Sequence, residues 1–133
     1  MNFYYLSKTK NLKKKLLKLL GLKKPSNIII DQLNIEKNNS IKRQIDKYRI
    51  FFKKTSLIIN AIGDLGEIKN VLGLDLKKFE KTLKTNFFSN LIILQNILKL
   101  RKKSKRLSII LFSGGGVTSF RKNFSAYSIS KIA

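Results

Sequence analysis

Short apolar runs alternate with longer amphipathic segments along this chain, and no other feature constrains its fold as strongly. Four runs predict strands, at residues 2–6 (NFYYL), 27–31 (NIIID), 56–60 (SLIIN) and 107–112 (LSIILF). Helical spacing of apolar residues separates them, over residues 11–22, 38–52 and 75–100, and a last helix begins at Ser125. Continuously apolar strands separated by helices are typical of a parallel sheet with helices on both faces. The order therefore predicts an α/β fold with a doubly wound parallel sheet, in a single domain.

Composition excludes several kinds of chemistry. The 133 residues include no cysteine and no histidine. The chain therefore has no disulfide, no thiol nucleophile and no histidine general base. We also expect no metal site, because the two commonest nitrogen and sulfur ligands of transition metals are absent from the sequence.

The charge of the chain suggests two alternative functions. Lys and Arg number 29 against seven Asp and Glu, which gives a net charge of +22. Such an excess is typical of proteins that bind nucleic acid or an anionic membrane surface, the latter through the basic amphipathic helix predicted at 11–22. The lysines are spread over every predicted helix, however, and that helix is equally suited to packing on a sheet. We therefore expect neither a specific nucleic acid nor a membrane as partner, and, without a long apolar run or a signal-peptide pattern, a cytoplasmic location.

Small and polar residues gather where the predicted strands end. They are Ser7, Asp31, the segment 60–63 and the segment 113–116. Ligands of open α/β sheets bind outside the carboxyl ends of the strands. The sequence therefore predicts a binding site at this edge of the sheet.

Tyr127 and Lys131 are spaced i, i+4 in the last predicted helix and so share one face of it. A nearby ammonium favours the phenolate form of a tyrosine, which can then exchange a proton with a carbonyl or alcohol oxygen. The Ser113 hydroxyl could hydrogen-bond the same oxygen. The alternative is a surface tyrosine and lysine, since Tyr4 and Lys8 repeat the spacing in a predicted strand.

Four segments in this order form a more specific pattern. They are NAIG at 60–63, TNFFSN with Asn86, IILFSGGG at 109–116 and NFSAYSISKIA at 123–133. Together they resemble the short-chain dehydrogenase/reductase family. The resemblance implies a partial NAD(P)-binding Rossmann-type domain over residues 1–133. It also implies an oxidoreductase that interconverts a carbonyl and an alcohol, with a small molecule as its substrate.

The resemblance assigns catalytic roles to four residues. Tyr127 corresponds to the acid/base, and Lys131 to the residue that binds the nicotinamide ribose and tunes the tyrosine. Asn86 corresponds to the helix asparagine that positions a proton-relay water, and Ser113 to the serine that orients the substrate. Ser113 lies 14 residues before Tyr127, whereas the family spacing of 13 would place Gly114 at the serine position. Either the loop has one extra residue or the serine role is lost.

The resemblance also predicts the cofactor-binding residues. Asn60 and Gly63 match the first asparagine and the glycine of the family's NNAG motif, on the adenosine side of the cofactor. No carboxylate follows the first strand, where Ser7 and Lys8 stand instead, and this favours NADP(H) over NAD(H). Asp31 is a further candidate, for the edge of the adenine ring.

Two parts of the family pattern are not found in these 133 residues: the first strand and its glycine-rich TGxxxGxG turn. In the strand order 3-2-1-4-5-6 that strand lies between strands 2 and 4. We therefore expect an incomplete Rossmann-like sheet of about four strands in two halves, as in a fragment, with little reductase activity of its own. The resemblance further implies a homo-oligomer of the full-length protein, through the helix around Asn86 and the helix at Ser125.

Overall fold

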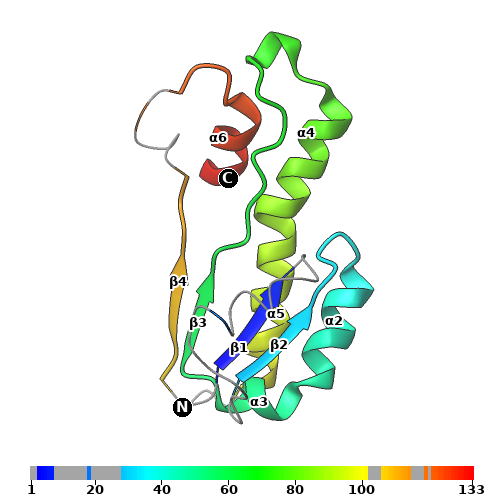
Figure 1. Ribbon diagram of the computed structural model, residues 1–133, viewed down its shortest axis with the longest axis vertical. Coiled ribbons are helices and arrows are strands. Elements are labelled where there is room, and N and C mark those ends of the chain that lie inside the picture. The colour runs from blue at the N-terminus through cyan, green and yellow to red at the C-terminus, as the bar shows by residue number, and fades with distance from the viewer. Residues whose placement is uncertain (1–2, 8–17, 19–27, 102–105, 115–118, 120) are drawn as a thin grey trace.

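Two pairs of parallel strands form the β-structure in the computed structural model of the chain (Figure 1). One pair is β1 (Phe3–Ser7) with β2 (Ile28–Gln32), and the other is β3 (Leu57–Asn60) with β4 (Ser108–Leu111). The structure describes residues 3–7, 18, 28–101, 106–114, 119 and 121–133. The helix predicted at 11–22 therefore lies outside the described residues.

The parallel pairing confirms the predicted fold class. All four strands run in the same direction, and in the view of Figure 1 they follow one another as β4, β3, β1 and β2. In the part of the chain that the structure describes, no strand joins the two pairs, as expected for a sheet that lacks its central strand.

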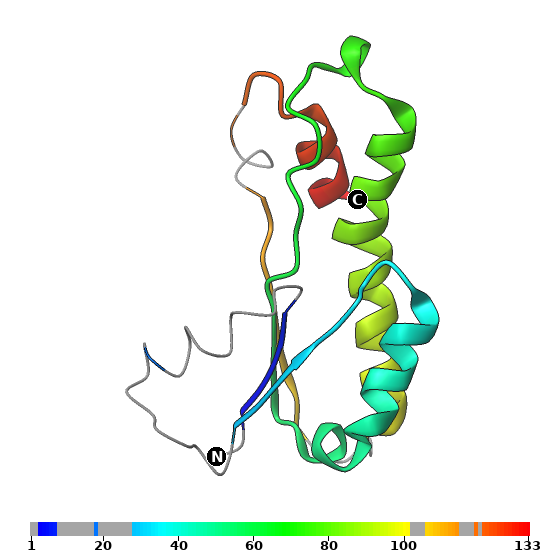
Figure 2. The ribbon, with the colours of Figure 1, turned by 45° about the vertical axis from the view of Figure 1, so that its right-hand side comes forward.

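Helices follow the strands as the apolar spacing predicts. Their bounds are α2 (Asn38–Lys47), α3 (Arg49–Lys54), α4 (Leu76–Leu83), α5 (Ser89–Leu100) and α6 (Ser125–Ile132), with a 3-10 turn η1 (Val71–Gly73) and a π-helical turn η2 (Lys84–Phe88). Figure 2 shows α2 and α5 next to each other on one side of the strands. The carboxyl ends of β3 and β4 point toward α6 (Figure 1).

The prediction of one helix over residues 38–52 is wrong, because the helix breaks at Tyr48. That residue has φ −111° and ψ 26°, and its N–H donates to the carbonyl of Ile45, three residues back, as in a 3-10 turn. The Tyr48 hydroxyl donates to Asp31 Oδ2 at 2.7 Å, which ties the break to the end of β2. The apolar spacing runs through the break, since Ile45 and Phe52 are both buried, and so does not reveal it.

The prediction of a helix over residues 75–100 is confirmed, with one irregularity. Asp75 caps its first turn by accepting from the backbone N–H groups of Lys77 and Lys78, at 2.9 and 3.2 Å. In the middle, the N–H of Ser89 donates to the Lys84 carbonyl, five residues back, which marks the π-helical turn. Such turns are frequent at functional sites.

The hydrophobic core lies between the helices α2, α3 and α5. Its buried members are Leu33, Ile41, Ile45, Phe52, Ile93 and Ile97. The β3–β4 pair is more open: Leu57, Ile59 and Leu111 are 42, 59 and 60 % exposed although all three are apolar. None of the described helices has the length and apolar character needed to cross a membrane.

Candidate functional site

A pocket of about 400 Å³ lies beyond the ends of β3 and β4, against α6. Its size is typical of small-molecule sites. It is lined by Ala61, Gly63, Leu65, Phe112, Ser113, Tyr127 and Lys131. Three segments far apart in sequence thus bring four of the predicted site residues to one place, at the sheet edge where the sequence predicts a binding site.

The Lys131 ammonium joins the two strand ends. It donates to the carbonyl oxygens of Ile62, at 3.2 Å, and of Phe112, at 3.4 Å. These residues follow β3 and β4 respectively, so one side chain of α6 holds both segments. Partial burial lowers the pKa of the Lys131 ammonium below its ordinary 10.5, because the charged form loses solvation.

Tyr127 lies one helical turn before Lys131, and its ring packs against the backbone at Gly114. A Cβ atom built on Gly114 would lie 2.7 Å from Tyr127 Cε1 and 3.1 Å from Lys131 Cγ. Helix α6 therefore approaches the turn after β4 as closely as a glycine permits. The tyrosine and the lysine share a face toward the pocket, as the i, i+4 spacing predicts.

Asn86 is buried, 6 % exposed, within the π-helical turn. Its Oδ1 accepts from the Asp64 N–H at 2.7 Å, and its Nδ2 donates to the Asp64 carbonyl at 2.8 Å. The same Nδ2 donates to Ser130 Oγ at 2.7 Å, and Ser130 in turn donates to the Tyr127 carbonyl at 2.9 Å. Asn86 thus fixes the loop after β3 and the helix that carries Tyr127, and does not line the pocket itself.

Asn60 and Gly63 lie where β3 ends. Asn60 Oδ1 accepts from the Ile62 N–H at 3.2 Å, while its buried Nδ2 has no partner among the described residues. A Cβ atom on Gly63 would lie 3.2 Å from Lys131 Nζ and 3.8 Å from Asn86 Oδ1. The glycine therefore leaves room beside the ammonium.

The remaining predicted cofactor residues belong to the other strand pair. Asp31, at the end of β2, accepts from Tyr48 at 2.7 Å and from Lys47 Nζ at 3.0 Å through one carboxylate oxygen. Ser7 is the last residue of β1, in register with Gln32. Lys8 lies outside the described residues. None of these residues lines the pocket at the ends of β3 and β4.

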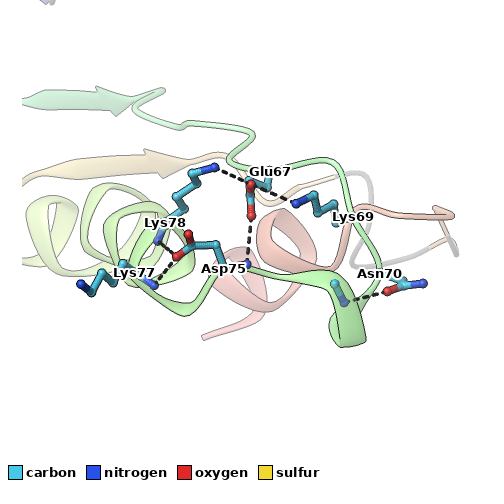
Figure 3. Close-up of polar contacts among 7 residues, drawn as sticks. Glu67, Lys69, Asn70, Asp75, Lys77 and Lys78 are labelled. Carbon is cyan, nitrogen blue, oxygen red and sulfur yellow. Dashed lines mark hydrogen bonds and ion pairs between the residues drawn. The ribbon is translucent and has the colours of Figure 1, made fainter.

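The loop that follows β3 is held against the start of α4 by Glu67 (Figure 3). Its carboxylate accepts from Lys78 Nζ at 2.8 Å and from the Asp75 N–H at 3.0 Å, and Lys69 Nζ lies at 3.4 Å. The bonds from Lys78 and from the Asp75 backbone hold the pKa of Glu67 at about 2. Ser125 N–H donates to the Lys69 carbonyl at 3.4 Å, so the same loop also contacts the start of α6.

The family model described as short chain dehydrogenase matches residues 1–133, the whole chain. The chain belongs to the short-chain dehydrogenase family. No curated protein matches this family member in sequence. This family assignment agrees with the resemblance carried by the motifs around Asn60, Asn86 and Tyr127.

Solved short-chain dehydrogenases share the fold. A short-chain type dehydrogenase/reductase from Mycobacterium ulcerans has a TM-score of 0.82 at 14% identity, over 97% of this chain and 48% of its own. A short-chain dehydrogenase from Streptomyces avermitilis has a TM-score of 0.83 at 14% identity, over 99% of this chain and 47% of its own. A short chain dehydrogenase from Escherichia coli complexed with NADPH has a TM-score of 0.82 at 16% identity, over 98% of this chain and 55% of its own. This short-chain dehydrogenase chain thus spans about half the length of the structures that it matches.

Sequence reasoning missed three residues of the site. Ser130 and Asp64 bond to Asn86, and Leu65 lines the pocket. Only Ser130 carried a signal, since it lies three residues after Tyr127 and next to Lys131. The hydrogen-bond partners of Asn86 lie 22 and 44 residues away in sequence, and no local sequence pattern predicts contacts over such separations.

Proposed function

We propose that this chain carries the proton-transfer part of an NAD(P)-dependent oxidoreductase that interconverts a carbonyl and an alcohol. The observation that supports this most directly is that Tyr127, Lys131 and Ser113 line one pocket at the carboxyl ends of β3 and β4. A phenol, an ammonium and a hydroxyl are the groups that such a reaction needs around one oxygen atom.

Tyr127 acts as the acid/base in this proposal. In the reduction its phenol gives a proton to the carbonyl oxygen, and in the oxidation its phenolate takes the proton of the alcohol. A bound nicotinamide cofactor supplies or accepts the hydride at the carbon atom. Lys131 lines the same pocket and would bind the nicotinamide ribose in this proposal.

Ser113 and Asn86 have supporting roles. The Ser113 hydroxyl donates a hydrogen bond to the substrate oxygen as negative charge develops there. Asn86 holds the loop after β3 through Asp64, and α6 through Ser130, and so positions the two segments that carry the site.

The residues present fit a nicotinamide–ribose group beside Lys131. Gly63 lines the same pocket as Lys131, and a Cβ atom at Gly63 would lie only 3.2 Å from Lys131 Nζ, so a larger residue there would crowd the ammonium. The buried Asn60 Nδ2 is a donor without a partner among the described residues, and it would serve with Gly63 on the adenosine side of the cofactor. Ser7, Lys8 and Asp31 would meet the adenosine half, at the ends of β1 and β2. The absence of a carboxylate after β1 supports a preference for NADP(H), as does the NADPH in complex with the Escherichia coli short chain dehydrogenase.

The full activity also needs parts that these 133 residues do not provide. The sequence contains no glycine-rich turn for the pyrophosphate, and among the described residues no strand joins the β1–β2 pair to the β3–β4 pair. We therefore expect slow turnover by the 133-residue chain on its own. The family match does not favour the alternative of a nucleic-acid or membrane-surface protein driven by the +22 charge.

Titration with NADPH tests the proposal. The chain contains no tryptophan, so the fluorescence of the dihydronicotinamide is observed without interference from the protein. We expect saturable enhancement for the wild type, and at least a tenfold weaker affinity for Lys131→Met, because the ammonium beside the pocket is lost. Lys42→Met, which removes the same charge from an exposed site on α2, is the matched control. Equal binding by both variants, or none by the wild type, would contradict the proposal.

A further inference from the structure

Helix α6 approaches the turn after β4 closely at Gly114, which is buried. A Cβ atom there would lie 2.7 Å from Tyr127 Cε1 and 3.1 Å from both Tyr127 Cζ and Lys131 Cγ. Side-chain carbons do not approach to 2.7 Å, so any residue other than glycine requires the ring to move. The Tyr127 ring thus fills the space that a side chain at position 114 would occupy.

Gly63, on the neighbouring strand end, shows that this contact is not a general property of the pocket. A Cβ atom on Gly63 would meet the far end of the flexible Lys131 side chain, at 3.2 Å, and that end can give way. At Gly114 the obstacle is an aromatic ring carried one turn earlier on the same helix. The two glycines therefore have different consequences for the site.

We infer that Gly114 is a positioning residue that seats the Tyr127 ring against the end of β4. The inference rests on this contact, and on the proposed function only in that Tyr127 is the acid/base. Family spacing would place the serine at position 114, where the ring now lies. Ser113, one residue earlier, lines the same pocket as Tyr127 and is exposed to it.

A double-mutant cycle on the 133-residue chain tests the contact without any assay of activity. The variants are Gly114→Ala, Tyr127→Leu and the two combined, since leucine lacks the Cε1 and Cζ atoms that the new methyl group would strike. We expect Gly114→Ala to lower the urea midpoint in the wild-type background, and the loss to shrink by at least half in the leucine background. Gly73→Ala is the matched control, because a Cβ there meets nothing closer than 3.5 Å. An equal loss in both backgrounds would overturn the inference.

A spectroscopic measurement keeps the test valid if Gly114→Ala fails to fold. In wild-type chain labelled with 3-fluorotyrosine, Tyr127→Phe assigns the fluorine resonance of residue 127. A ring packed against backbone rotates slowly, so we expect that resonance to be split or broadened relative to free fluorotyrosine. A sharp resonance at the shift of free fluorotyrosine would overturn the inference.

If neither NADPH binding nor Tyr127-dependent turnover is found in the wild type, the proposed function fails. The stability cycle and the fluorine spectrum then still decide the role of Gly114.

Discussion

The side-chain amide of Asn86 donates a hydrogen bond of 2.7 Å to the hydroxyl of Ser130, and this bond joins the π-helical turn to α6. Ser130 is only 2 % exposed, and it passes the connection on to the Tyr127 carbonyl. The proposed acid/base is therefore held through its own backbone by a residue of another helix. The geometry of the pocket depends on this buried polar network as much as on apolar packing.

Ser130→Ala removes the link between Asn86 and α6. We expect a loss of about 1 kcal/mol in the free energy of unfolding, since Asn86 Nδ2 keeps its bond to the Asp64 carbonyl. Urea unfolding measures the change, with Ser128→Ala on the same helix as the control. A loss as small as that of the control would show that the network does not hold α6.

Gly66→Ala addresses the loop after β3. Gly66 has φ +66°, a conformation that favours glycine, and a Cβ atom would meet the Thr82 hydroxyl and lie 2.9 Å from Thr82 Cγ2. Strain and overlap together should cost about 1–3 kcal/mol. Thermal or urea unfolding beside Gly73→Ala, which has neither problem, gives the comparison. Unchanged stability would contradict the conformation of this loop.

Glu67→Gln tests the contact between the loop and α4. The pKa of Glu67 is held at about 2, chiefly by Lys78 and then by the Asp75 N–H, against an ordinary value of 4.5. The unfolded chain takes up a proton at higher pH than the folded chain, so this contribution to stability is complete above pH 4.5 and is lost as the pH falls toward 2.

The measurement is the unfolding free energy across that pH range. We expect Glu67→Gln to reduce the fall in unfolding free energy at low pH. Glu80→Gln, at an exposed position on α4, should leave that fall unchanged. Added salt should weaken the effect in the wild type, because the Lys78 side chain is exposed to solvent. Identical pH profiles for wild type and Glu67→Gln would contradict the assigned bonds.

Lys131 should produce a pH dependence of the same sign as Glu67, but in the alkaline range. Partial burial lowers the pKa of this lysine below 10.5, so between the folded value and 10.5 the unfolded chain binds more protons than the folded one. Stability therefore rises with pH across this window. Lys131→Met should remove that rise, and Lys42→Met should keep it, in unfolding curves recorded from neutral pH to pH 10.5. A rise that persists in Lys131→Met would contradict burial as its cause.

Local patterns predicted the strands and the last helix because each is specified by a few neighbouring side chains. The apolar runs at 56–60 and 107–112 fall within one or two residues of β3 and β4, and the i, i+4 spacing brings Tyr127 and Lys131 to one pocket. The break at Tyr48 was not predicted, because its cause includes a bond to Asp31, 17 residues away. Nor was the seat of the Tyr127 ring on Gly114, since spacing cannot show how closely two elements approach.

The +22 net charge also affects how copies of the chain meet, because the strand pairs are open. Leu57, Ile59 and Leu111 offer apolar strand surface to any second copy, and unpaired strand edges are templates for association. Like charge on every molecule opposes such encounters by colloidal repulsion, over a Debye length of about 10 Å at 0.1 M salt and about 3 Å at 1 M. We therefore expect the chain to remain dispersed in dilute buffer and to precipitate as the ionic strength rises.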